Sequence, residues 1–188
     1  MMNATMSALG MVELSSIGVA FAVQDAMLKA ADVDLLVART ICSGKYMVMI
    51  GGDVAAVEAS VAAGRSASRE ALIDDLVLPN IDRRVFPAIT GAVALEDSDR
   101  DALGILEAFS VTSLIEGADA AVKAANVKLF RVHVAMAIGG KAFLMLTGSV
   151  SAVEASVEAG ARGIAKRGLL VSKIVIPRPA PELFKETL

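Results

Sequence analysis

The sequence predicts an α+β protein made of two tandem copies of one small domain. Three observations predict it: stretches of sequence recur at a nearly constant spacing, strand-like and helix-like segments follow the same order in both halves, and 188 residues fit two small domains. Hydrophobic residues make up 55% of the chain, but aromatic residues only 4%. We therefore expect more apolar surface than a monomer of this size needs, which indicates association between chains.

The composition also excludes several classes of protein. No apolar run approaches the roughly 18–20 residues of a membrane-spanning helix, so we expect no membrane partner. The net charge of −3 and the lack of clustered Lys and Arg argue against nucleic acid as a partner. One Cys rules out an intrachain disulfide framework and fits a reducing cytoplasm, and one His leaves no Cys/His metal site within a chain.

The chain repeats itself at a shift of 94 residues. Residues 8–13 match residues 102–107, and the match continues through the helix-like segment that follows. A period this long indicates duplication of a whole domain rather than a solenoid unit. We place the two domains at residues 1–94 and 95–188, joined near a Gly and a polar, Asp-rich run.

The spacing of the repeat changes at two places. It rises to 96 past Cys42 and to 98 at the last strand of each copy, so the second copy carries two insertions of two residues. Because insertions are tolerated best in loops, we expect both to lie in loops, the first between Met136 and Gly140.

Each copy shows the same order of elements. Those expected in the first copy are, in order, a strand at 10–15, a helix at 18–31, strands at 33–39 and 45–51, a helix at 54–69 and a strand at 72–78. Asp53 has the side chain of an N-cap for the second helix, and Pro79 ends the last strand. The order β-α-β-β-α-β predicts two ferredoxin-like domains, each an antiparallel sheet with two helices on one face.

Several motifs of the chain resemble those of bacterial microcompartment shell proteins. They cover nearly the whole chain, and they include Gly10-Met11-Val12-Glu13, residues 25–33, Ser43-Gly44, Gly52-Asp53-Val54 and Ile176-Pro177-Arg178-Pro179. Two copies in one chain are similar to the tandem-domain class, and residues 40–45 are similar to those of its T-type members from propanediol-utilising shells. The resemblance implies a structural protein without enzymatic activity. It would form a homotrimer of pseudo-six-fold shape that tiles a microcompartment shell in the cytoplasm.

The same resemblance implies a role for each motif. The loops between the second and third strands would line a central pore, with Thr40, Ile41, Cys42, Ser43 and Gly44 from the first copy and Ala137, Ile138, Gly139 and Gly140 from the second. Other residues would lie at the tile edge and contact other shell proteins: Lys29, Lys123 and Arg178. The first copy departs from the family here, because Asn80 follows Pro79 where an Arg is expected.

Cys42 is the residue with the most chemistry. One thiolate cannot hold an iron–sulfur cluster, which takes about four Cys ligands. The resemblance to T-type members implies one [4Fe–4S] cluster per trimer, held by Cys42 of three chains with a water or small molecule as fourth ligand. Ser43 and Gly44 would lie beside it, and Lys45 would add positive charge if it faces inward. The pore would then pass electrons, or deliver a cluster, to redox enzymes of the lumen.

Other interpretations stay open at this point. Cys42 can equally be a small buried hydrophobe with no role, in a trimer whose pore passes small metabolites. A ferredoxin-like regulatory protein that binds a small ligand is another alternative. Glu13 and Glu107 suggest acid–base catalysis, but carboxylates that are hydrogen-bonded to backbone or to a neighbouring subunit account for them better. His133 either faces the pore or packs at a strand end.

Overall fold

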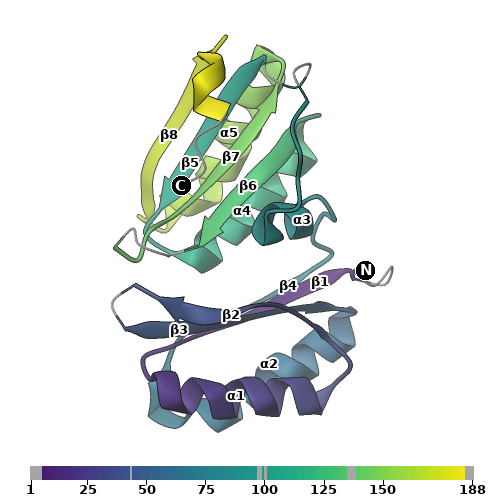
Figure 1. Cartoon of the computed structure of the whole chain (residues 1–188), viewed down its shortest axis with the longest axis vertical. Helices are drawn as coiled ribbons and strands as arrows, with labels where there is room; N and C mark the ends of the chain where they lie inside the picture. Colours follow the sequence, from purple (N-terminus) through teal and green to yellow (C-terminus); the bar gives the residue numbers. More distant parts are fainter. Residues whose placement is uncertain (1–5, 43, 97–98, 100, 135–138, 185–188) are drawn as a thin grey trace. The chain divides into compact units, whose positions relative to one another are not determined.

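The structure, a computed structural model, describes residues 6–42, 44–96, 99, 101–134 and 139–184. Contacts divide the chain into two compact units, the first of residues 1–83 together with 135–140 and the second of residues 84–134 and 141–188. Each unit contains one antiparallel sheet and two long helices, which confirms the predicted fold class (Figure 1). No helix within the described ranges is long and apolar enough to cross a membrane.

The first unit follows the predicted order of elements. They are β1 (Ala8–Leu14), α1 (Ile17–Ala30), β2 (Asp34–Ile41), β3 (Lys45–Gly52), α2 (Val54–Ser68), the short 3-10 helix η1 (Arg69–Ala71) and β4 (Leu72–Pro79). The strand order is β2-β3-β1-β4, and both helices lie on one face of the sheet (Figure 1). The side chains of Ser16 and Asp53 accept hydrogen bonds from the N–H groups of Val19 and Ala56, so each helix begins at a polar N-cap.

The second unit repeats the first. Its elements are β5 (Ala102–Ala108), α4 (Val111–Ala124), β6 (Lys128–Val134), β7 (Ala142–Gly148), α5 (Val150–Lys166) and β8 (Leu170–Pro177). The strand order β6-β7-β5-β8 is the same arrangement. The registers agree as well, because Ala8 pairs with Pro79 in one sheet and Ala102 with Pro177 in the other.

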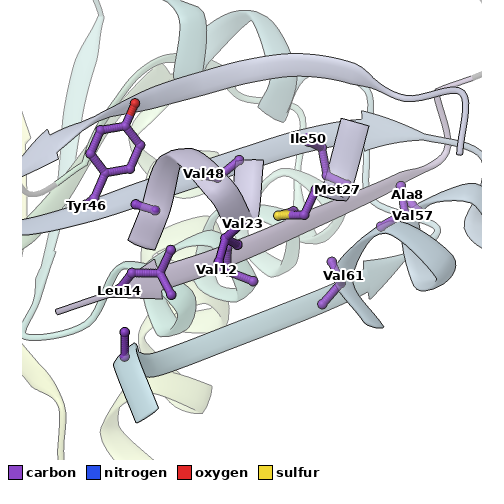
Figure 2. Packing of buried hydrophobic residues seen from close by; sticks show 12 residues of the cluster. Ala8, Val12, Leu14, Val23, Met27, Tyr46, Val48, Ile50, Val57 and Val61 are labelled. Atoms are coloured by element: carbon purple, nitrogen blue, oxygen red, sulfur yellow. The ribbon is translucent and has the colours of Figure 1, made fainter. Parts of the chain in front are cut away.

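The core of the first unit lies between its sheet and its two helices. Buried side chains that meet there include Val12, Val23, Met27, Val48, Val57 and Val61 (Figure 2). Gly10 allows α2 to approach β1, because a Cβ there would lie 2.8 Å from Val57 Cγ1 and 2.7 Å from Val61 Cγ2. A Cβ at Gly104 would meet two Val side chains of α5 at 2.8 Å in the same way. The Gly that recurs in both copies therefore serves close packing of strand against helix.

The structure corrects two details of the predicted elements. Thr40 and Ile41 are the last residues of β2 rather than part of a loop, and they pair with Tyr46 and Lys45 of β3. Both are β-branched, and such residues pack well in strands. The second insertion does not lie in a loop, because α5 has 17 residues where α2 has 15.

A short helical segment follows the last strand of each repeat, and neither was predicted. The first, α3 (Val85–Thr90), comes after β4 but belongs to the second unit, where it packs against β6 and α4. The second, the 3-10 helix η3 (Pro181–Phe184), comes after β8. The ring of Phe184 contacts that of Phe130 in β6, with 6.1 Å between centroids.

Candidate functional site at the β2–β3 turn

Cys42 lies in the tight turn that joins β2 to β3. The two strands pair as far as Ile41 and Lys45, and Cys42 and Gly44 are turn residues between them; Ser43 lies outside the described residues. Cys42 is half-buried. Gly44 has a left-handed backbone with a φ of 74°, and a Cβ there would meet nothing within 4 Å. Cys42 therefore lies two residues before a glycine at which a side chain would meet no other part of the structure.

Lys45 is paired with Glu13 directly below this turn. Its Nζ donates a hydrogen bond to Oε1 of Glu13 at 2.7 Å, and the Glu13 side chain is only 11% exposed. Glu13 is thus a hydrogen-bonded carboxylate, as expected, but its partner is a side chain of its own unit. The charge of Lys45 is balanced by this pair, so it does not provide the unpaired positive charge that we considered for a cluster.

The second unit has an equivalent ion pair at its corresponding turn. Lys141 donates to Oε1 of Glu107, and the hydroxyl of Ser172 donates to the other carboxylate oxygen at 3.2 Å. Sequence inspection singled out both Glu residues but missed their partners. The signal was present, because the Glu residues recur at a shift of 94 and the Lys residues at 96.

The predicted pore loop of the second copy is described only in part. Ala137 and Ile138 lie outside the described residues, as does most of the predicted first insertion. Gly139 and Gly140 form a turn with positive φ angles of 66° and 81° before β7. His133 packs at the end of β6, where its ring stacks on that of Phe143 at 5.0 Å.

The predicted edge residues lie on exposed positions of both units. Lys29 and Lys123 occupy the last turns of α1 and α4, and each pairs with an Asp four residues earlier at 2.6 Å. Arg178 is exposed after β8 with a φ of 49°, and Asn80 has a φ of 54° after β4. The first copy therefore has the same backbone conformation at this position, with Asn80 in place of the Arg and Ile81 in place of the second Pro.

Lys29 comes shortly before the start of β2, and Cys42 comes directly after its end. The eight residues of β2 span roughly 26 Å at the usual rise of a strand. The structure thus separates the predicted edge of the first unit from its predicted pore.

No group of three or more His, Cys, Asp or Glu side chains that could hold a metal occurs among the described residues. The chain contains a single Cys. Any site that needs several thiolates must therefore draw them from several chains.

Comparison with known proteins places both units in one family. The BMC domain model matches residues 8–81 and 102–179, which are the two repeats without the short helices that follow them. The chain belongs to the BMC domain family, with two copies of the domain. It is a shell protein of a bacterial microcompartment.

Individual relatives agree with this assignment. The chain is 46% identical over 179 residues to the bacterial microcompartment shell protein PduT of Citrobacter freundii, covering 95% of this chain and 96% of PduT. A crystal structure of a microcompartment protein from Desulfitobacterium hafniense DCB superposes with a TM-score of 0.93 at 47% identity, covering 97% and 100% of the two chains. The shell protein EutM of Escherichia coli K12 matches 44% of this chain and 84% of its own length at 46% identity.

Proposed function

We propose that the chain assembles as a cyclic trimer that tiles a microcompartment facet, with Cys42 of three chains holding one [4Fe–4S] cluster at the centre. The observation that carries this proposal is the position of Cys42, in the β2–β3 turn of a duplicated BMC domain beside the open backbone of Gly44. The cluster, when bound, supplies one-electron transfer. The tile would then pass electrons to redox enzymes of the lumen and would have no catalytic activity of its own.

The apolar surface of α1 supports assembly into a trimer. Ile17, Phe21 and Leu28 lie on one face of this helix, and all three are exposed, Phe21 to 60%. Several large apolar side chains exposed on one helix face are typical of a surface that contacts another protein. The exposed Lys29, Lys123 and Arg178 provide charged groups for contacts with other shell proteins.

The donor set fits a cluster only if chains share it. One Cys per chain gives three thiolates in a trimer, and the fourth iron would take a water or small molecule. The half-buried Cys42 is accessible enough to bind a ligand, and no Cβ at Gly44 blocks backbone N–H groups from approaching a sulfide. The chain's own contribution is to hold its thiolate next to the end of β2.

Anaerobic purification tests both parts of the proposal. Light scattering should give three chains per particle for the wild type and for Cys42→Ser, since the turn does not hold the units together. Iron analysis should give about one cluster per three wild-type chains, with an electron paramagnetic resonance signal that Cys42→Ser lacks. Equal iron content in the two proteins after reconstitution would refute the cluster and leave a metabolite pore as the remaining function. A monomer at micromolar concentration would refute the tile.

A further inference from the structure

The two short helices that follow the repeats occupy equivalent places in the sequence. At the shift of 98 that aligns the last strands, Leu183 corresponds to Val85 and Phe184 to Phe86. Val85 and Phe86 are 0% and 1% exposed, whereas Leu183 is 36% exposed. The first segment is buried in a complete apolar site. The second lies against its own unit, with Phe184 on Phe130, and leaves Leu183 partly exposed.

The site of α3 lies on the second unit, not on the repeat that precedes it. α3 packs against β6 and α4, and Pro87 lines the same hollow as Leu129 of β6. Arg84 donates a hydrogen bond to the carbonyl oxygen of Val122 near the end of α4. Each repeat is therefore followed by a short helical segment, α3 or η3. The segment after the first repeat, α3, covers the second unit.

The first unit carries the equivalent surface, and none of the described residues covers it as α3 covers the second unit. Leu35 and Leu28 correspond, at a shift of 94, to Leu129 and Val122. Leu35 is 42% exposed and Leu28 is 37% exposed, whereas Leu129 and Val122 are 2% and 1% exposed. The chain thus has one unfilled site on its first unit and one incompletely buried segment at its C-terminal end.

We infer that η3 of one chain docks on β2 and α1 of a second copy, as α3 docks on β6 and α4. In a ring of identical chains, the domain that comes after the second unit in this head-to-tail order is the first unit of a neighbour. A repeated head-to-tail contact closes a ring when its rotation is a whole fraction of a turn, which the proposed trimer requires to be one third. The apolar pair Leu183–Phe184 carries the contact, because Glu182 replaces Arg84 and cannot donate to a helix carbonyl. This inference rests on the proposed trimer.

Cross-linking of two differently tagged chains tests the docking. In a Cys42→Ser background, one chain carries Leu35→Cys and the other Leu183→Cys, and the two are co-expressed and oxidised. The control replaces Leu35→Cys by Ile73→Cys, because Ile73 is also 42% exposed but lies on β4, at the opposite edge of the sheet. We expect at least five-fold more covalent heterodimer from the Leu35 pair than from the Ile73 pair.

Light scattering on the same samples separates the failure of this contact from the failure of the trimer. A trimer with equal heterodimer yields from both pairs would overturn the docking and leave the trimer intact. An intrachain disulfide between Cys residues at 130 and 184 that forms fully in the trimer would also overturn it, because η3 would then stay on its own unit. Samples that contain monomers alone would refute the trimer, and the docking with it.

Discussion

Two Gly residues of α5 should respond in opposite ways to the same substitution. A Cβ at Gly160 would lie 2.7 Å from the carbonyl oxygen of Gly117 in α4 and 2.7 Å from Leu106 Cδ1. A Cβ at Gly163, three residues further along the helix, would meet nothing within 4 Å. Gly160→Ala and Gly163→Ala thus make the same chemical change in one helix, with and without a close neighbour.

The expected magnitudes follow from two opposing terms. Replacing Gly by Ala within a helix gains about 0.8–1 kcal/mol from helix propensity. Overpacking costs about 1–3 kcal/mol, and the upper part of this range applies at Gly160 because a backbone oxygen cannot rotate away as a side chain can. We therefore expect Gly160→Ala to lower the free energy of unfolding by about 1–2 kcal/mol and Gly163→Ala to raise it by up to about 1 kcal/mol.

Urea unfolding followed by circular dichroism measures both changes. The two variants and the wild type should show the same dependence on urea concentration and differ only in midpoint, because the surface exposed on unfolding is unchanged. If Gly160→Ala proved as stable as Gly163→Ala, the close crossing of α4 and α5 would be wrong.

Three further changes test other contacts. Lys45→Met should lower the free energy of unfolding by about 1–3 kcal/mol, which lies between the values typical of surface and of buried ion pairs. Adding Glu13→Gln should recover part of this loss. If Lys45→Met unfolded at the same urea concentration as the wild type, the ion pair would be contradicted. Asp53→Ala should cost about 1 kcal/mol by removing the N-cap of α2, and an unaltered melting temperature would argue against that cap. The hydrogen bond from Lys173 holds the pKa of Glu158 below its ordinary value of 4.5, so Lys173→Met should raise it in a carboxyl NMR titration. Because the folded pKa is depressed, the stabilisation is present above pH 4.5 and is lost as the pH falls through the folded pKa; identical titration curves would exclude the pair.

The repeat made most of the fold predictable. Residues 8–13 and 102–107 match at a fixed shift, and they form β1 and β5 in equivalent registers. Strand ends were less predictable, because Thr40 and Ile41 were assigned to a loop on resemblance although their β-branched side chains favour a strand. Local periodicity also could not place α3, since its apolar residues are buried by contacts with β6 and α4 that are distant in sequence.

The candidate site was predictable in position but not in its electrostatics. The alignment of residues 40–45 identified the turn that holds Cys42, and the structure places Cys42 there. The pairing of Glu13 with Lys45 joins residues 32 apart on different strands, so it depends on the register of β1 against β3. Register follows from which face of each strand is buried. For β1, the sequence alone did not show whether the face that carries Glu13 is buried.

Comparison of the two repeats shows which glycines are needed for packing and which lie in turns. Gly10 and Gly104 occupy the same close contact of strand and helix in both copies, and any side chain there would collide with a helix. The turns are constrained differently, because Cβ atoms at Gly44, Gly139 and Gly140 would meet nothing within 4 Å but all three residues have the positive φ that favours glycine. The first turn carries the single Cys of the chain, which the second copy lacks. A ring of six identical domains would place six thiols around its axis, whereas the proposed trimer places three there. Three thiolates leave one iron of a [4Fe–4S] cluster without a protein ligand, and an iron count and ligand-exchange experiment on the wild-type trimer would reveal that open position.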